Sequence, residues 1–210
     1  MKPRLVTLLD LGLDEDFDAS MSFVQGLLKN VNAGFTHPIL NVDFVRSRDT
    51  WTIDGAMRSR CSVLHVMSHG DHEEGPTFSS SDEETEVNLE SIADTMIEEG
   101  YGIKAGAILA DGCKTGIGVW KRAIRDCIED PVTYIGTTRK IGWHEPTVFG
   151  GAFYGALLRN RGRGSTPAEQ TFDAAERAIK AYEILTDTTC PFTVTTLEPS
   201  KRAIRAFQSG

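Results

Sequence analysis

The chain has 210 residues, of which 40% are hydrophobic and 25% are charged, and its formal net charge is −8. This composition is that of a soluble globular protein, and the length fits a single domain over residues 1–210, so wholesale disorder and a second full domain are not expected. The negative charge disfavours nucleic acid and anionic membranes as partners, and no apolar run approaches the roughly 20 residues that span a bilayer.

The first half of the chain alternates short apolar runs with segments of helical periodicity. Strands are predicted, in chain order, over residues 4–9, 39–45 and 62–67. Helices are predicted between them, from the apolar stripe Phe17, Met21, Val24 and Leu28 and from a shorter segment over residues 50–57. The strand over 62–67 is apolar on both faces, which is typical of a central strand in a parallel sheet.

An acidic segment over residues 71–88 then interrupts the pattern. It is rich in Asp and Glu and contains no Lys or Arg. Such a charge run is typical of a solvated surface hairpin, which is the interpretation we prefer. Its charge would also favour basic substrates at a site that it borders.

The alternation of strands and helices resumes at Asn88, a predicted N-cap in front of the apolar stripe Leu89, Ile92, Ala93 and Met96. Further strands are predicted over residues 105–110, 132–136 and 192–194, and further helices over 120–128, 147–158 and from Thr166 onward. The run Thr166-Pro167-Ala168-Glu169 combines an N-cap, a first-turn proline and a capping-box glutamate. The whole pattern predicts an α/β protein, built as a three-layer α/β/α sandwich on a mainly parallel central sheet.

The four cysteines are widely and irregularly spaced, so the chain does not require a disulfide framework. Since we identify no targeting segment, a reducing cytoplasm is the expected setting. Cys61, Cys127 and Cys190 fall beside or on predicted core elements and are expected to be buried thiols. Cys113 directly follows a buried strand, which makes it the candidate reactive thiol.

Two short motifs follow the two most buried strands, where open α/β sheets place their functional sites. Ser68-His69-Gly70 follows one strand, and Asp111-Gly112-Cys113 follows the other. With Tyr134-Ile135-Gly136-Thr137 and Phe153-Tyr154 farther along, these segments resemble the caspase-like cysteine peptidases, which include caspases, metacaspases, separases, gingipains and CHAT proteases. The resemblance spans roughly residues 60–160 and implies the caspase-like fold.

The resemblance also implies an activity, that of a cysteine endopeptidase. Cys113 is then the nucleophile, and His69 donates a proton to the departing amine. No third catalytic residue, metal or organic cofactor is implied. The implied partner is a protein or peptide substrate, and a regulatory protein partner is compatible with the resemblance.

The predicted surroundings of Cys113 agree with a nucleophilic role. It lies between a strand end and a helix expected to begin near Ile117, whose positive N-terminal dipole favours a thiolate. Gly112 and Gly116 are expected to keep its surroundings open. Gly70 offers a bare backbone N–H that, together with the N–H of Cys113, is predicted to bind an oxyanion.

The motif around Cys113 departs from that of true caspases. Asp111-Gly112 replaces Gln-Ala before the cysteine, and Lys114-Thr115-Gly116 replaces the usual Arg-Gly after it. The sequence instead resembles the D-x-C-x-S/T-G pattern of metacaspases, which implies that Asp111 binds substrate and directs cleavage after Arg or Lys. The alternative is that Asp111 caps the following turn or satisfies backbone donors.

Two other classes of function compete with the peptidase. The run His69-Gly70-Asp71-His72 matches the latter half of the H-x-H-x-D-H motif of metal-dependent hydrolases. Met67 occupies the first histidine position of that motif, so a metal site lacks a ligand. The other alternative is a catalytically silent interaction module that has kept the fold.

The remaining histidines and one aromatic residue allow simpler interpretations. His65 lies on the buried strand and is expected to be a satisfied core residue. His37 and His144 are predicted loop residues. Trp143, in the loop after the strand over 132–136, either walls a substrate groove or anchors that loop.

Overall fold

The computed structural model describes residues 4–11, 17–33, 36, 39–73, 75–79, 86–159 and 166–208. Its central feature is a six-stranded sheet with the strand order β2-β1-β3-β7-β8-β9. The strands are β1 (Arg4–Asp10), β2 (Leu40–Arg46), β3 (Cys61–Met67), β7 (Ala105–Asp111), β8 (Val132–Thr137) and β9 (Phe192–Leu197). All neighbouring pairs are parallel except β8 and β9, so the predicted mainly parallel sheet is confirmed.

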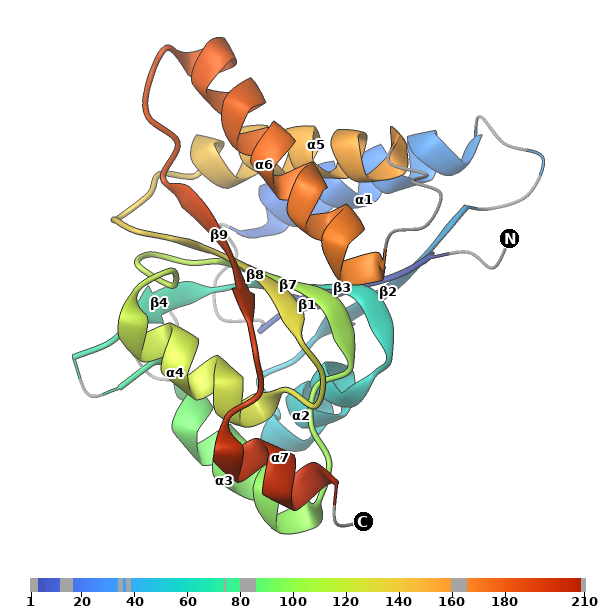
Figure 1. Ribbon diagram of the computed structural model, residues 1–210. Helices are drawn as coiled ribbons and strands as arrows, with labels where there is room; N and C mark the ends of the chain where they lie inside the picture. The colour runs from blue at the N-terminus through green and yellow to red at the C-terminus, as the bar shows by residue number, and fades with distance from the viewer. Residues whose placement is uncertain are drawn as a thin grey trace.

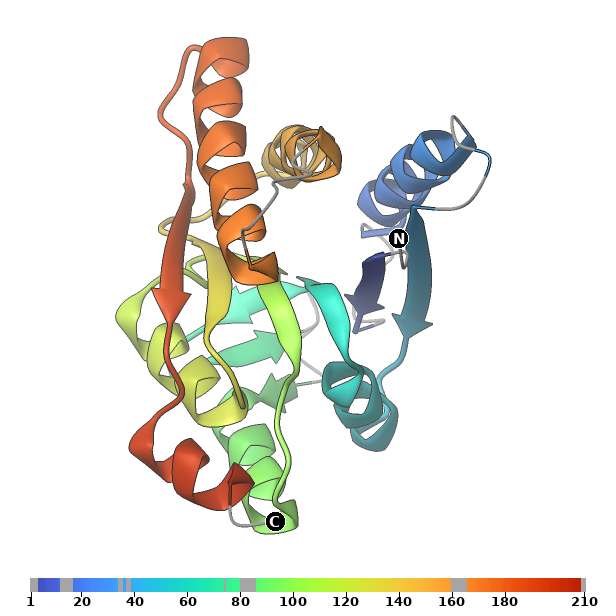
Figure 2. The same cartoon turned by 45° about the vertical axis from the view of Figure 1, so that its right-hand side comes forward.

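Helices cover both faces of this sheet (Figures 1 and 2). On one face lie α1 (Phe17–Ala33), α5 (His144–Arg159) and α6 (Pro167–Thr186). On the other face lie α2 (Thr50–Arg58), α3 (Leu89–Glu99), α4 (Gly118–Cys127) and α7 (Lys201–Phe207). The predicted three-layer α/β/α sandwich is therefore confirmed.

The alternation of side chains along β3 explains why the strand has apolar residues on both of its faces. Val63 and Met67 belong to the core under α1, α5 and α6. Leu64 and Val66 belong to the second core, under α2, α3 and α4. A parallel strand with helices on both faces has no side turned to water, so these four side chains are apolar, and the polar His65 of the same strand is fully buried.

Two helix starts follow the capping chemistry that the sequence predicts. The Asn88 side chain accepts hydrogen bonds from the backbone N–H groups of Glu90 and Ser91 at the start of α3. At the start of α6, Thr166 and Glu169 form the reciprocal capping box. Each cap satisfies backbone donors that the first turn of a helix leaves without partners.

The acidic segment forms more structure than a surface hairpin. Strands β4 (His69–Asp71), β5 (Thr77–Ser79) and β6 (Glu86–Asn88) make a small antiparallel sheet. Phe78 and Val87 are buried and join the core under α2, α3 and α4, so this sheet is anchored by apolar contacts. Four of the acidic residues that motivated the hairpin prediction, Glu74, Asp82, Glu83 and Glu84, lie outside the described residues.

The topology brings the two predicted motifs to one edge of the sheet. Strands β3 and β7 are direct neighbours, and Met67 at the end of one is in register with Asp111 at the end of the other. The backbone N–H of Ser68 extends the contact by donating to the carbonyl of Asp111. Because the strands are parallel, the residues that follow them emerge side by side.

No helix in the described ranges is long and apolar enough to cross a membrane.

Candidate active site

Cys113 and His69 line the same cavity at the carboxyl edge of the central strands. The cavity has a volume of about 40 Å³. Its other walls come from the ends of β3 and β7, from the starts of α1 and α5 and from the loop after β8: Phe17, Ser68, Asp111, Gly112, Ile141, Gly142, Trp143 and Pro146. Two motifs far apart in the sequence thus contribute to one site.

Two aromatic rings hold the imidazole of His69. Its ring meets Phe17 edge-on at 5.3 Å between centroids and Trp143 at 5.7 Å. Phe17 and Trp143 also contact each other, at 4.8 Å. The three rings form an apolar wall that restricts the orientation of the imidazole. Trp143 therefore walls the cavity, which was one of the two interpretations open from the sequence, and Phe17 is a lining residue that the sequence indicated only as a core position.

Cys113 is the one cysteine of the four that is not buried. Burial raises the pKa of both Cys61 and Cys190 to about 11. Burial also raises the pKa of Cys127, well above its ordinary value. These three thiols stay protonated and inaccessible near neutral pH, as expected of core cysteines. The Sγ atom of Cys113 lies 4.0 Å from the carbonyl oxygen of Ile141, in the loop after β8.

The turn that carries Cys113 is held by a set of hydrogen bonds from β8. The buried hydroxyl of Thr115 donates to the carbonyl of Ala110 at 2.9 Å and accepts from the backbone N–H of Thr137 at 3.1 Å. The Tyr134 hydroxyl donates to the carbonyl of Thr115 at 2.7 Å. Lys114 adopts a left-handed conformation with φ of 57°, which an L-residue tolerates only where surrounding contacts impose it.

The glycines beside Cys113 allow close backbone packing, and the prediction that Gly112 and Gly116 leave open space is wrong. A Cβ atom on Gly112 would lie 3.0 Å from the carbonyl oxygen of Ser68, and one on Gly116 would lie 2.7 Å from that of Gly136. At Gly70, a Cβ would lie 2.5 Å from the carbonyl oxygen of Cys113 and 3.2 Å from its nitrogen. The backbones of the histidine and cysteine segments are thus in direct contact.

This contact bears on the predicted oxyanion site. The nitrogen of Gly70 lies 3.4 Å from the position that a Cβ on Gly112 would occupy. The backbone nitrogens of Gly70 and Cys113 therefore belong to one tightly packed patch beside the thiol. A pair of N–H groups in such a patch is the arrangement that stabilises a developing oxyanion in acyl transfer. Their role as oxyanion donors stays a prediction.

Asp111 lines the cavity but is itself buried, with 4% of its surface exposed. Its Oδ2 atom lies 2.6 Å from Nε2 of His65, whose Nδ1 lies 2.9 Å from the Tyr154 hydroxyl. His65 is thus a satisfied core histidine, as predicted. The second carboxylate oxygen of Asp111, Oδ1, has no hydrogen-bond partner among the described residues.

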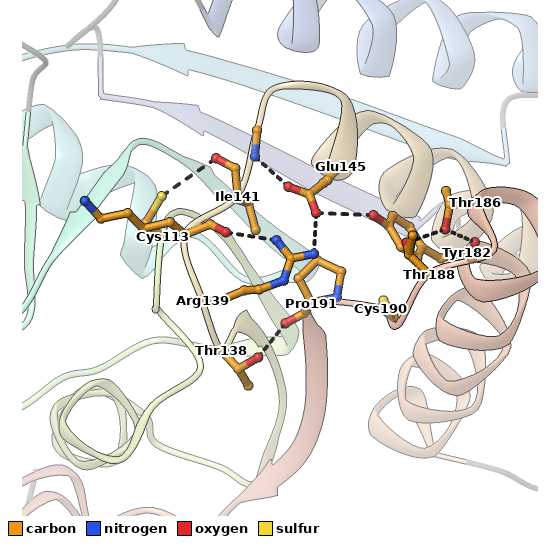
Figure 3. A network of polar contacts seen from close by, with 12 residues as sticks. Cys113, Thr138, Arg139, Ile141, Glu145, Tyr182, Thr186, Thr188, Cys190 and Pro191 are labelled. Carbon is orange, nitrogen blue, oxygen red and sulfur yellow. Dashed lines mark hydrogen bonds and ion pairs between the residues drawn. The ribbon is translucent and has the colours of Figure 1, made fainter.

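A buried glutamate holds the loop that closes the cavity (Figure 3). Glu145, at the start of α5, accepts from the backbone N–H of Gly142 at 2.6 Å and from Arg139 at 2.7 Å. The Tyr182 hydroxyl of α6 also lies 3.3 Å from this carboxylate. Burial alone raises the pKa of Glu145, but the hydrogen bonds from Gly142 and Arg139 outweigh it and hold the pKa below its usual 4.5. The loop that presents Ile141 to Cys113 is thereby tied to two helices.

The histidine–aspartate run of the metal-hydrolase alternative does not gather ligands in the described part of the chain. No group of three or more His, Cys, Asp or Glu side chains there is placed to hold a metal ion. The Asp71 carboxylate instead accepts from the backbone N–H groups of His72 and Glu73. Of the other histidines, His144 begins α5 and does not lie in a loop, whereas His37 lies outside the described residues.

Comparison by sequence finds neither a protein-family model nor a curated protein that matches the chain. Comparison by structure finds a secreted C11 cysteine protease from Bacteroides thetaiotaomicron. Its complex with an irreversible peptide inhibitor aligns with a TM-score of 0.53 and 12% identity, over 87% of this chain and 60% of the protease. A second structure, of a secreted C11 cysteine protease of the same organism called iotapain, aligns with a TM-score of 0.58 and 11% identity, over 93% of this chain and 67% of that one.

The separase–securin complex of Saccharomyces cerevisiae also aligns, over 94% of this chain and 12% of that one, with a TM-score of 0.48 and 9% identity. The C11 proteases are similar enough to establish the fold, and the chain has the caspase-like α/β fold that they share. It spans about 60% of the inhibitor-bound protease. A specific likeness to CHAT proteases or metacaspases and a cytoplasmic location both stay predictions.

The contact between the two motif backbones predicts the effect of a methyl group at residue 70. In Gly70→Ala, the new Cβ meets backbone atoms that cannot rotate away, so we expect a loss of about 1–3 kcal/mol in the free energy of unfolding. The rate at which iodoacetamide alkylates Cys113 should also change, because the two segments must separate. The control is Gly155→Ala on α5, where nothing lies within 4 Å and helix propensity favours alanine. Equal stability changes in the two variants would contradict the packing argument.

The Glu145 carboxylate predicts a pH-dependent contribution to stability. In Glu145→Gln, an NH₂ group replaces one carboxylate oxygen and faces the N–H of either Gly142 or Arg139, which is also a donor. We therefore expect a loss of about 1–3 kcal/mol in the free energy of unfolding at pH 7. Because the folded-state pKa is lowered, the carboxylate stabilises the fold above pH 4.5 and loses this effect as the pH falls through the lower folded value. Urea unfolding of both proteins at falling pH measures the difference, which should shrink with acidification. Glu176→Gln, on the exposed side of α6, is the control. A difference that does not depend on pH would exclude the carboxylate as its source.

Proposed function

We propose that the protein is a cysteine endopeptidase that cleaves protein substrates, with Cys113 as nucleophile and His69 as acid and base. One observation carries the proposal. The only cysteine of the chain that is not buried shares a cavity with a histidine, at the carboxyl edge of the central strands of a fold that C11 cysteine proteases also have. A cysteine that only fills the core would not be expected beside a histidine in a cavity, so this placement supports a catalytic role.

The proposed reaction proceeds in two steps. His69 takes the proton of the Cys113 thiol, and the sulfur attacks the scissile carbonyl carbon. The peptide C–N bond then breaks, and His69 passes the proton to the departing amine. A thioester joins Cys113 to the acyl part of the substrate. Water then attacks the thioester and gives a proton to His69. The C–S bond breaks, the carboxylic acid product leaves, and His69 returns the proton to the sulfur, which restores the thiol. The N–H groups of Gly70 and Cys113 are proposed to bind the oxyanion of both tetrahedral intermediates.

The second part of the proposal concerns the residue before the scissile bond, which we propose is Arg or Lys. Asp111 supports this because it lines the cavity and leaves Oδ1 without a partner in the described residues. A guanidinium or ammonium group would supply the missing charge-assisted hydrogen bond, whereas an acidic side chain would be repelled. The alternative role, in which Asp111 satisfies backbone donors, has no hydrogen bond to support it in the described residues.

The size of the cavity adds a condition to this specificity. At about 40 Å³, the cavity is small for the side chain of a lysine or arginine. A lysine or arginine side chain therefore requires the cavity to widen. Trp143, which is 44% exposed and belongs to the closing loop, is the wall that we propose moves. Rearranged side chains are common when proteins bind their partners.

The proposed pairing of Cys113 with His69 predicts which cysteine a thiol-directed reagent labels first. Biotinylated iodoacetamide should label Cys113 before the other cysteines, and Cys113→Ala should remove both this label and peptide cleavage. His69→Ala should lower the cleavage rate on the order of 10² or more. Mass spectrometry of tryptic peptides locates the label, and His72→Ala is the matched control for loss of a nearby histidine. A stably folded Cys113→Ala variant that still cleaves peptides would refute the proposed nucleophile, whereas an unmodified protein that cleaves no peptide would favour the catalytically silent module.

The charge of Asp111 predicts the cleavage preference. Fluorogenic peptides that differ only in the residue before the scissile bond should be cleaved fastest with Arg or Lys. Asp111→Asn should reduce that preference tenfold or more, because a hydrogen bond to a charged group contributes about 1.5–3 kcal/mol. Asp71→Asn, which changes an exposed carboxylate, is the control. If the unmodified protein prefers Asp or an uncharged residue, or if Asp111→Asn keeps the preference for Arg and Lys, then Asp111 does not set the specificity.

A further inference from the structure

Three buried side chains link α5 to the cavity through β3. The Tyr154 hydroxyl of α5 lies 2.9 Å from Nδ1 of His65, and Nε2 of His65 lies 2.6 Å from Oδ2 of Asp111. Tyr154 and His65 are fully buried and Asp111 nearly so. The proposed catalytic steps use neither Tyr154 nor His65. The chain nevertheless ends on the carboxylate that lines the cavity with Cys113.

The hydrogen-bond partners determine where the protons of this chain lie. Burial, and then the nearby charge of Asp111, raise the pKa of Tyr154 well above its ordinary value, so the hydroxyl keeps its proton. Its only hydrogen-bond partner in the described ranges is Nδ1 of His65. Nδ1 must therefore accept this proton, since otherwise the buried O–H would lack an acceptor. The other ring nitrogen, Nε2, then carries the hydrogen and donates it to Asp111.

This arrangement gives Asp111 a neutral donor. A neutral imidazole orients the carboxylate through Oδ2 and leaves its negative charge uncancelled. Within the described residues, the Asp111 carboxylate forms no ion pair with Lys or Arg. A buried carboxylate without a cation is costly, and the cost falls when a cationic ligand arrives at Oδ1. In the described residues, the Asp111 carboxylate thus lacks a cationic partner at Oδ1, the oxygen that His65 does not contact.

We propose that His65 and Tyr154 are positioning residues for substrate specificity. They hold the Asp111 carboxylate turned so that Oδ1 receives the guanidinium or ammonium group of the residue before the scissile bond. This inference rests on the proposed function and adds two residues that touch no substrate. It also explains a polar chain in a layer where apolar side chains would serve packing equally well.

The experiment compares two substrates that differ in charge and hardly in shape. One fluorogenic peptide carries Arg before the scissile bond, and the other carries citrulline, in which a neutral urea group replaces the guanidinium. The quantity measured is the ratio of kcat/KM for the two peptides, which cancels general losses of activity. The unmodified protein should favour Arg at least tenfold, and Asp111→Asn should remove most of that ratio.

Three variants test the positioning role. His65→Leu removes the donor to Asp111 and should lower the ratio at least tenfold, mainly by raising KM for the Arg peptide. His65→Gln can still donate an N–H toward Asp111 and should recover much of the ratio. Tyr154→Phe keeps the ring but frees Nδ1, so the ratio should fall by a smaller factor. The matched control is Tyr101→Phe, which removes a hydroxyl that donates to the Asp54 carboxylate on the other face of the sheet.

The outcomes separate the two proposals. If the unmodified protein cleaves neither peptide or shows no preference for Arg, the proposed specificity fails and this inference fails with it. If Asp111→Asn removes the preference while His65→Leu and Tyr154→Phe keep it, only the positioning role is overturned. A loss that is equal for both peptides also overturns it, because the residues are then purely structural. Should His65→Leu not fold, Tyr154→Phe decides alone, and an unchanged ratio in that variant rejects the proposal.

Discussion

The whole site depends on the backbone contact between the segments that leave β3 and β7. Gly70 approaches the backbone of Cys113 so closely that no side chain fits between them. This contact exists because two parallel strands are neighbours and end in register, at Met67 and Asp111. A helix-covered parallel sheet places such strand ends at one edge, where polar groups can be exposed beside a rigid core. The strand ends therefore bring the segments of the thiol and the imidazole together, and the loop that carries Trp143 contributes to the wall against the imidazole.

The surroundings of this contact are held by polar groups that are buried and paired. Thr115 and Thr137 fasten the cysteine turn to β8, and Glu145 fastens the closing loop to α5 and α6. Each of these groups loses water on folding, so each contributes only when its partner is in place. Such networks specify one arrangement of the cavity. Asp111 is the exception, since one of its two oxygens is left without a partner in the described residues, and that oxygen belongs to a carboxylate on the cavity wall.

This chain and the C11 proteases have the same fold at very low sequence identity. At 11–12% identity, the structures still align over 87–93% of this chain. Core packing tolerates exchange among apolar residues of suitable volume, so a sheet and its helices outlast recognisable sequence. The chemistry of a site requires particular atoms, and the proposed reaction requires few: a thiol, an imidazole and two backbone N–H groups.

Much of this structure was predictable from local pattern. The doubly apolar strands, the Asn88 cap and the Thr166–Glu169 capping box depend on residues near one another in the chain, so the sequence by itself determined the layer architecture and the two strand ends that carry His69 and Cys113. The packing role of Gly112 and Gly116, the aromatic wall of Phe17 and Trp143, and the pairing of His65 with Asp111 and Tyr154 were decided only by the tertiary structure. Each of these joins residues from separate elements, and periodicity along one strand or helix carries no information about which side chain of another element it will meet.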